Sequence, residues 1–187
     1  MALPPDVKVS TEILWKATLI FAPIDVVFVS ILAWRIDARA FRSCKRTLIV
    51  TTAIFWFSMW MVMASGRFWD SVYHYVFPAW ARWFIPPAYG LLFGAVSWLF
   101  WHLALRIPGR SVVNYCLLGG LWGALTHMWA ISRGILTKPP MLQGASPVAA
   151  VVFPIFEFIL YWCITVSVTL LVRRLGAPEC SQSLPNR

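Results

Sequence analysis

The sequence predicts an all-α polytopic membrane protein, a bundle of five transmembrane helices. Of its 187 residues, 60% are hydrophobic and only 12% are charged, and the mean hydropathy is +0.72. A soluble domain has about 45–50% apolar and about 25% charged residues. The apolar residues also form long stretches without the alternation of a barrel strand. These three observations exclude a water-soluble fold.

Five apolar stretches are long enough to cross a hydrocarbon core of about 30 Å, for which a helix needs about 20 residues. In chain order they run from about 14–34, 48–65, 85–105, 112–131 and 148–172. The connections are too short for a soluble domain, so residues 1–187 are expected to form a single integral membrane domain. The first stretch is expected to be a retained helix, because Asp25 interrupts it and no small-x-small cleavage site follows.

The distribution of Lys and Arg predicts the orientation of these helices. The side holding the first connection and the C-terminal tail is the more basic one, with Arg35, Arg39, Arg42, Lys45, Arg46, Arg106, Arg110, Arg173, Arg174 and Arg187. The opposite side has Lys8, Lys16, Arg67, Arg82, Arg133 and Lys138. Cytoplasmic loops are enriched in such cations, so the N-terminus is expected outside and the C-terminus in the cytoplasm.

The same cations account for the formal net charge of +9, because they lie beside anionic lipid headgroups. The expected partner is therefore the lipid bilayer of a plasma membrane or a bacterial inner membrane. Nucleic acid is not an expected partner, since no soluble element carries a basic face.

The outward segment 66–84 is too polar to span the membrane and too aromatic for a free loop. Its Trp69, Tyr73, Trp80 and Trp83 suit the membrane–water interface. It is expected to form a short helix on the outer surface that ends near Pro78, or else a lid over a cavity between the spans.

The fourth span contains two small-xxx-small pairs, Gly119 with Gly123 and Gly120 with Ala124. Such pairs let a neighbouring helix approach closely. They predict tight packing, either within the chain or in a homo-oligomer through Gly119, Gly120 and Gly123.

The four cysteines give no pattern of a disulfide or metal site. Cys44 and Cys180 fall in predicted cytoplasmic segments, Cys116 and Cys163 fall within spans, and no C-x-x-C occurs. Thiol-redox chemistry and structural zinc are therefore not expected.

Four ionisable residues lie within the predicted spans, namely Asp25, His102, His127 and Glu157. Such residues are costly in hydrocarbon and often functional. His102 is three residues from the inner end of its span, so it is expected to reach the cytoplasmic interface. The other three have similar predicted depths, and a proline precedes each acid by two or three residues. They are expected to line a polar pocket in the outer half of the bundle.

The leading hypothesis is a membrane enzyme that acts on a lipophilic small molecule by acid–base chemistry, with or without a metal. Glu157 would be the principal acid, His127 its partner, and Asp25 would stabilise charge. A carboxyl in an aromatic, low-dielectric cavity can stay protonated and protonate an alkene, while aromatic faces stabilise the developing cation.

A metal site is a second expectation for the outer edge of the pocket. Asp70 and His74 are four residues apart, so they would share one face of a helix. Together with His127 and Glu157 they would form a two-histidine, two-carboxylate set suited to iron, zinc or copper. A b-type haem is not expected, because His102 and His127 lie at opposite ends of their spans, and no cofactor is assigned.

Two other classes of function remain open. A proton-coupled small-molecule transporter would use midplane carboxyls to bind and release protons. A non-catalytic accessory subunit would use Glu157 and His127 only to lock two helices together. An aromatic cavity at Glu157 would favour the enzyme, a water-accessible route to Asp25 would favour transport, and direct Glu157–His127 packing would favour the subunit.

Overall fold

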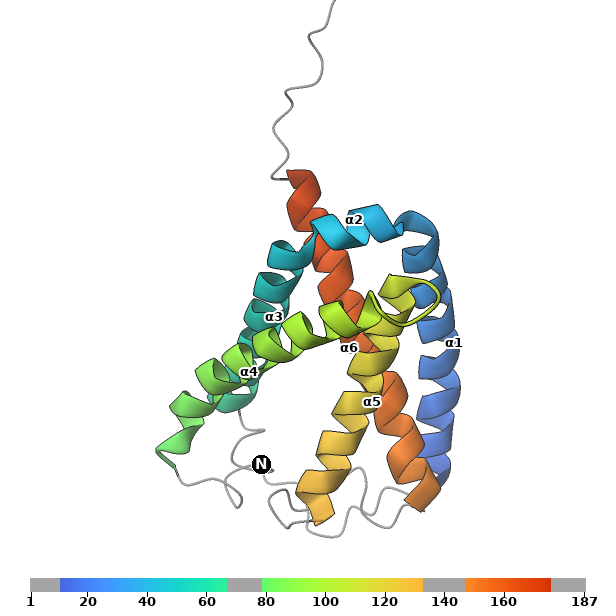
Figure 1. Cartoon of the computed structure of the whole chain (residues 1–187). Helices are drawn as coiled ribbons and strands as arrows, with labels where there is room; N and C mark the ends of the chain where they lie inside the picture. Colours follow the sequence, from blue (N-terminus) through green and yellow to red (C-terminus); the bar gives the residue numbers. More distant parts are fainter. Residues whose placement is uncertain (1–10, 67–78, 133–146, 176–187) are drawn as a thin grey trace, which may run out of the picture.

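The computed structural model describes residues 11–66, 79–132 and 147–175, and every regular element within these ranges is an α-helix. The expected all-α fold is therefore confirmed for the described part of the chain. In chain order the helices are α1 (Thr11–Arg35), α2 (Ala38–Ser43), α3 (Lys45–Ser65), α4 (Ala81–Ala104), α5 (Ser111–Ser132) and α6 (Pro147–Leu175) (Figure 1).

Four of the described helices, α1, α3, α4 and α6, are long and apolar enough to cross a membrane. The chain is therefore a multi-pass membrane protein. Helix α5 occupies the fourth predicted span, but its described apolar stretch, Ser111–Thr126, is shorter than the other four. A fifth crossing by α5 stays a prediction.

Helix α4 begins at Ala81, four residues before the predicted span. Residues 81–84, which the sequence assigned to an interfacial segment, are thus part of α4, and residues 67–78 of that segment lie outside the described residues. The helix continues through Pro86 and Pro87, although each lacks the N–H that would bond to the carbonyl four residues earlier.

Helix α2 was not expected from the sequence. A carboxylate oxygen of Asp37 caps it by accepting a hydrogen bond from the Ala40 N–H at 2.6 Å. Its Phe41 side chain is buried, and the Phe41 carbonyl accepts a hydrogen bond from Trp101 Nε1 at 3.1 Å. This short helix therefore lies against α4 and covers one end of the bundle (Figure 1).

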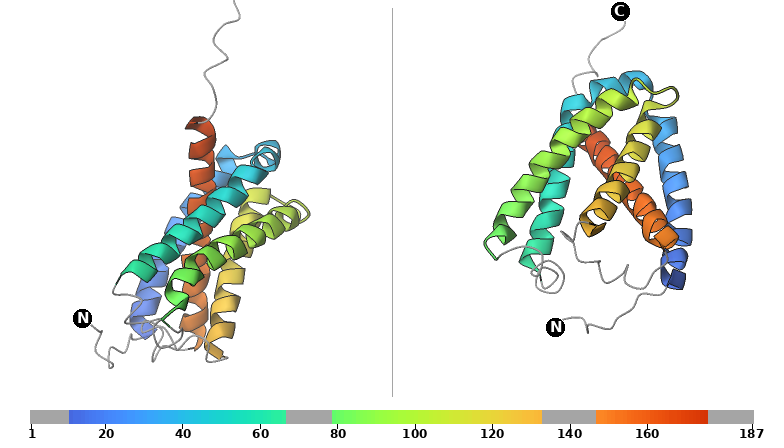
Figure 2. Two further views of the ribbon diagram at one scale, coloured as in Figure 1. Left: turned by 90° about the vertical axis from the view of Figure 1, so that its left-hand side faces the viewer. Right: turned by 60° about the horizontal axis from the view of Figure 1, so that its bottom comes forward.

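The long helices form two groups. Helices α3 and α4 pack as an antiparallel pair with the most extensive contact in the structure, and α1, α5 and α6 form the second group. Helix α6 also contacts α3, so it joins the two groups. The groups meet at the end that carries α2 and spread apart toward the opposite end (Figures 1 and 2).

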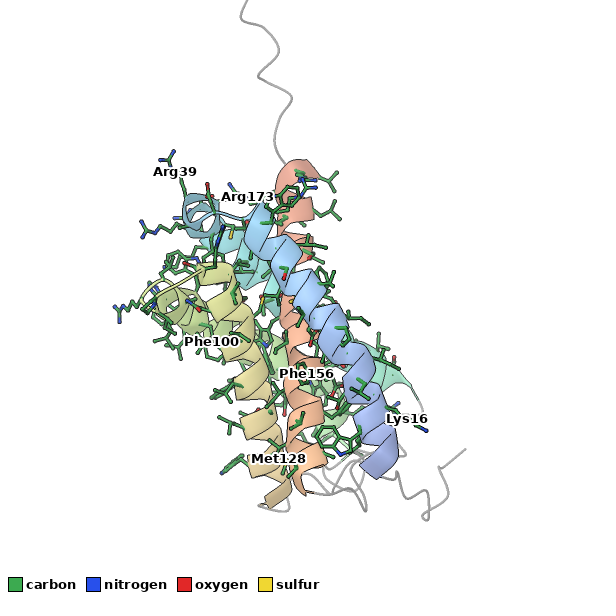
Figure 3. All side chains as sticks on the ribbon, turned by 90° about the vertical axis from the view of Figure 1, so that its right-hand side faces the viewer. Lys16, Arg39, Phe100, Met128, Phe156 and Arg173 are labelled. Carbon is green, nitrogen blue, oxygen red and sulfur yellow. The ribbon has the colours of Figure 1, made fainter. Side chains whose placement is uncertain are left out.

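The described parts of the segments predicted to be cytoplasmic lie together at the end that carries α2 (Figure 1). Arg39 and Arg173 are at this end, while Lys16 and Met128 are at the other (Figure 3). Arg173 Nη1 donates a hydrogen bond to Ser43 Oγ at 2.8 Å, and Arg110 Nη1 donates one to the Ala33 carbonyl at 2.8 Å. These bonds tie α6 to α2 and the start of α5 to α1.

The glycines of α5 pack against α6 of the same chain. A Cβ atom at Gly119 would overlap the ring of Trp162, and one at Gly123 would overlap the ring of Phe158. At Gly120 the added atom would lie 2.9 Å from the Ile155 carbonyl oxygen. Packing of this face within the chain is therefore confirmed, and a homo-oligomer through the same glycines stays a prediction.

Large apolar side chains cover the outside of the bundle. Exposed examples occur on each long helix, including Leu19 of α1, Val62 of α3, Leu91 of α4, Leu125 of α5 and Leu171 of α6. A soluble protein seldom exposes apolar side chains on all sides, so this surface is suited to contact with lipid tails.

Replacement of Gly123 by Ala is expected to destabilise the protein by about 1–3 kcal/mol, because the added methyl overpacks the α5–α6 contact. Ala95→Val is the matched control, since Ala95 is exposed on α4 and the larger side chain would meet only lipid or detergent. Unfolding of the purified protein in detergent measures both. Equal stability of the two variants would contradict the tight packing of α5 on α6.

Candidate functional site

Asp25 lies in the middle of α1 and faces the interior of the bundle. Its side chain is only 2% exposed, and neither carboxylate oxygen has a hydrogen-bond partner among the described residues. Its neighbours in sequence, Ile24 and Val26, point outward and are exposed. The carboxyl of Asp25 is within electrostatic range of the Cys116 thiol of α5. A buried charge without a partner is costly, so this residue is the most unusual polar group in the described bundle.

Glu157 has a partner and lies in a different environment. It is half-buried on α6, and the Tyr161 hydroxyl one turn later donates a hydrogen bond to its Oε1 at 2.8 Å. The Tyr161 ring lies edge-on to Trp56 of α3, with 5.7 Å between centroids, and 6.2 Å from the ring of Phe55. This carboxyl is therefore hydrogen-bonded beside an aromatic wall formed by α3 and α6.

The two acids have different neighbours among the described residues. The Asp25 carboxyl is within electrostatic range of Cys116 of α5, and Glu157 accepts a hydrogen bond from Tyr161. His127 lies on α5, but its side chain is outside the described residues. The pocket shared by Asp25, His127 and Glu157 therefore stays a prediction.

The predicted outer metal ligands, Asp70 and His74, also lie outside the described residues. Within the described ranges, no group of three or more His, Cys, Asp or Glu side chains is placed to hold a metal ion.

Two cysteines that the sequence analysis set aside lie next to each other. Cys116 Sγ of α5 and Cys163 Sγ of α6 are 3.7 Å apart, and both side chains are fully buried. Their position follows from the glycine contact, because Gly120 packs on Ile159, Cys116 lies one turn before Gly120 on α5, and Cys163 lies one turn after Ile159 on α6. We call Asp25, Cys116 and Cys163 the acid–thiol cluster.

A network of buried hydroxyls lies beside this cluster. The Tyr115 hydroxyl is 2.7 Å from Ser97 Oγ and 3.4 Å from Thr52 Oγ1, and all three side chains are fully buried. A second contact of 2.5 Å joins Thr51 Oγ1 of α3 to Thr169 Oγ1 of α6. These polar groups satisfy one another and connect α3, α4, α5 and α6.

Cys44 links the network to the end of the bundle that carries α2. Its buried thiol lies outside the spans, within electrostatic range of both the Tyr115 hydroxyl and the Arg173 guanidinium. Burial raises the pKa of the Cys44 thiol, and the positive charge of Arg173 opposes this effect.

His102 lies near the inner end of α4, where the sequence analysis expected it. Its Nε2 is 3.2 Å from Lys45 Nζ, and the Lys45 ammonium lies 4.7 Å from the ring centroid of Trp101. This residue therefore belongs to the polar end of the bundle and not to either acid.

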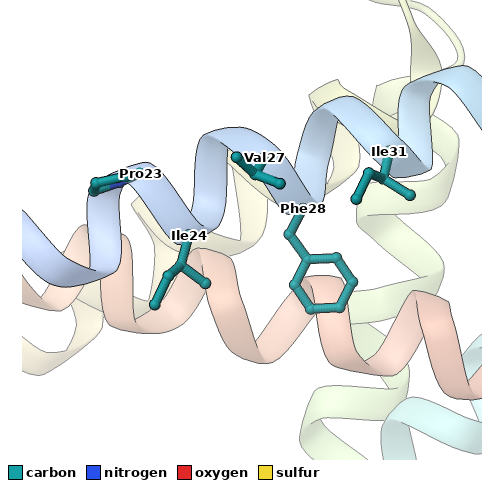
Figure 4. Close-up of a pocket in the computed structure, with 5 residues that line it drawn as sticks. All are labelled: Pro23, Ile24, Val27, Phe28 and Ile31. Atoms are coloured by element: carbon teal, nitrogen blue, oxygen red, sulfur yellow. The ribbon is translucent and has the colours of Figure 1, made fainter.

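A hollow on the surface of α1 is lined by five side chains: Pro23, Ile24, Val27, Phe28 and Ile31 (Figure 4). All of them are apolar, and neither Glu157 nor the acid–thiol cluster contributes to it. Comparison with known proteins finds no matching family model, curated protein or solved structure.

Replacement of Tyr115 by Phe is expected to lower the free energy of unfolding by about 1–2 kcal/mol, because it leaves the buried Ser97 and Thr52 without their shared partner. Ser167→Ala is the matched control, since the half-buried Ser167 hydroxyl donates a hydrogen bond to the Cys163 carbonyl of its own helix at 2.9 Å. Unfolding in detergent compares the two variants. A larger loss for Ser167→Ala would contradict a helix-joining role for the Tyr115 network.

Proposed function

We propose that this multi-pass membrane protein is a proton-coupled transporter of a small solute, and that Asp25 binds and releases the proton. The supporting observation is the burial of both Asp25 carboxylate oxygens without a hydrogen-bond partner in the described chain. An unpaired carboxylate in hydrocarbon costs several kcal/mol, so a proton neutralises the group in this conformation. Its release requires water or a partner to reach Asp25, which couples proton binding to a change of conformation.

The position of α1 at the edge of the bundle supports this proposal. Of the four candidate spans, α1 has the smallest fraction of its apolar stretch buried inside the bundle. The helix packs against α6 and α5 but not extensively against the α3–α4 pair. A movement of α1 relative to α6 and α5 would therefore change the surroundings of Asp25 without disturbing the α3–α4 pair.

The proposed topology has five spans, an outside N-terminus and a cytoplasmic C-terminus. The whole chain forms one integral domain of a plasma or bacterial inner membrane. The gathering of Arg39 and Arg173 at one end of the bundle supports this orientation (Figure 3).

The second candidate function is the membrane enzyme acting on a lipophilic small molecule. It is favoured by the hydrogen bond from Tyr161 to Glu157 beside an aromatic wall. In that reaction Glu157 would supply the proton, His127 would be its partner, and Asp70 and His74 would hold a metal at the entrance.

The decisive measurement is the infrared difference spectrum of the purified protein as the pH is changed. We expect the carbonyl band of a protonated carboxyl to respond to pH in the wild type and to disappear in Asp25→Asn. In Glu157→Gln the band should remain. Loss of the band in Glu157→Gln alone would instead favour the enzyme and overturn the proton-carrying role of Asp25.

The topology makes a separate prediction. A green fluorescent protein fused after Leu175 is expected to fluoresce, because that end of the chain faces the cytoplasm. An alkaline phosphatase fused after Ser65 should be active, since the outer end of α3 faces the other side. The reverse pattern of activities would show that the orientation is inverted.

A further inference from the structure

We propose that one anionic phospholipid binds along α1, with an acyl chain in the hollow of Figure 4 and its phosphate on Arg35. This site goes beyond general contact with the bilayer, because it selects one class of lipid at one place on the surface. It does not depend on the proton-carrying role of Asp25, whose side chain is buried on another side of the same helix.

The hollow suits an acyl chain in size and in chemistry. Its volume is about 360 Å³, which lies within the range of roughly 300–1,000 Å³ found for small-molecule sites. All five lining side chains are apolar, and an apolar cavity gives water no partners. Ile24, Val27 and Ile31 are exposed, so a hydrocarbon chain of the surrounding lipid can reach the hollow.

Arg35 lies at one end of the hollow because of the helix geometry. Pro23, Val27 and Ile31 line the hollow at intervals of four residues, and side chains at this interval form one row along a helix surface. Arg35 is the next member of the row and the last residue of α1. The row therefore runs from the apolar hollow to an exposed cation at the polar end of the bundle.

The Arg35 guanidinium is positioned but not neutralised. Its Cζ lies 4.5 Å from the ring centroid of Trp34, and this cation–π contact leaves its N–H groups able to bind a phosphate. Asp37, the nearest acid in sequence, caps α2, and no carboxylate in the described part of the chain forms an ion pair with Arg35. Trp34 is 74% exposed, as suits an indole at the level of the headgroups.

The length of the row matches one leaflet of a bilayer. Twelve residues separate Pro23 from Arg35, which is about 18 Å along a helix, and half of a hydrocarbon core is about 15 Å. An acyl chain whose headgroup lies at Arg35 can therefore fill the whole hollow. In the proposed topology this is the cytoplasmic leaflet, where anionic lipids are concentrated. A lipid without net charge would fit the hollow but would not balance the charge of Arg35.

The binding experiment titrates lipids into the full chain, purified in detergent, and detects the complexes by native mass spectrometry. Phosphatidylglycerol and phosphatidylcholine with identical acyl chains are compared. We expect one phosphatidylglycerol per wild-type chain, bound at least tenfold more tightly than phosphatidylcholine, and we expect Arg35→Gln to abolish this preference. Arg174→Gln is the matched control and should keep the preference, because Arg174 is also an exposed arginine in the last turn of a helix.

A second pair of variants tests the hollow itself. Val27→Trp fills the hollow with an indole and is expected to weaken the binding of both lipids at least fivefold. Val26→Trp is the matched control, because Val26 is an exposed valine next to Val27 that does not line the hollow. Equal affinities of these two variants would overturn the position of the acyl chain.

Other results would overturn the site as a whole. Equal affinity of the wild type for the two lipids would show that the hollow takes any lipid. An equal loss of preference in Arg35→Gln and Arg174→Gln would leave only a general attraction between cations and anionic lipid. A dimer without bound lipid that Val27→Trp dissociates and Val26→Trp preserves would show that a second copy of the chain occupies the hollow.

Discussion

The direct contact of α5 with α6 is the interaction on which most of the bundle depends. Lipid tails are as apolar as leucine side chains, so membrane helices associate through close packing and polar contacts. Gly119 provides the space for Trp162, whose ring then lies edge-on to Tyr115 at 5.1 Å and 5.5 Å from the ring of Phe100. Through this one indole, α6 contacts both α5 and α4. The same contact sets the register that places Cys116 beside Cys163.

A second constraint is that polar groups in the bundle must find partners within it. The Tyr115 network and the Tyr161–Glu157 bond meet this requirement. The exceptions in the described chain are the indole N–H groups of Trp56 and Trp162 and both oxygens of Asp25. An indole N–H left without a partner carries no charge and cannot change its protonation, whereas a carboxyl can take up a proton. This difference distinguishes Asp25 from the other buried polar groups.

The sequence predicted the features that depend on composition and local pattern, and missed those that depend on the rotation of one helix against another. The apolar stretches were sufficient to predict the long helices, and the glycine pairs were sufficient to predict the tight packing of α5. Similar depth predicted a common pocket for Asp25, His127 and Glu157, and that pocket stays a prediction, because depth does not determine which side of a helix a residue faces. The pairing of Cys116 with Cys163 required the α5–α6 register. The Asp37 cap of α2 could have been read from the sequence.

The acid–thiol cluster is divided between helices that are held in the bundle to different extents. Both thiols lie on α5 and α6, which the glycine contact holds together, whereas the carboxyl lies on α1, the least buried of the candidate spans. A movement of α1 would leave the two sulfurs at their spacing and remove the acid from their side. Water could then reach Asp25, and its carboxyl could release a proton. Proton release would thus follow from a displacement of α1 that leaves the α5–α6 contact intact, because the carboxyl and the glycine contact lie on different helices.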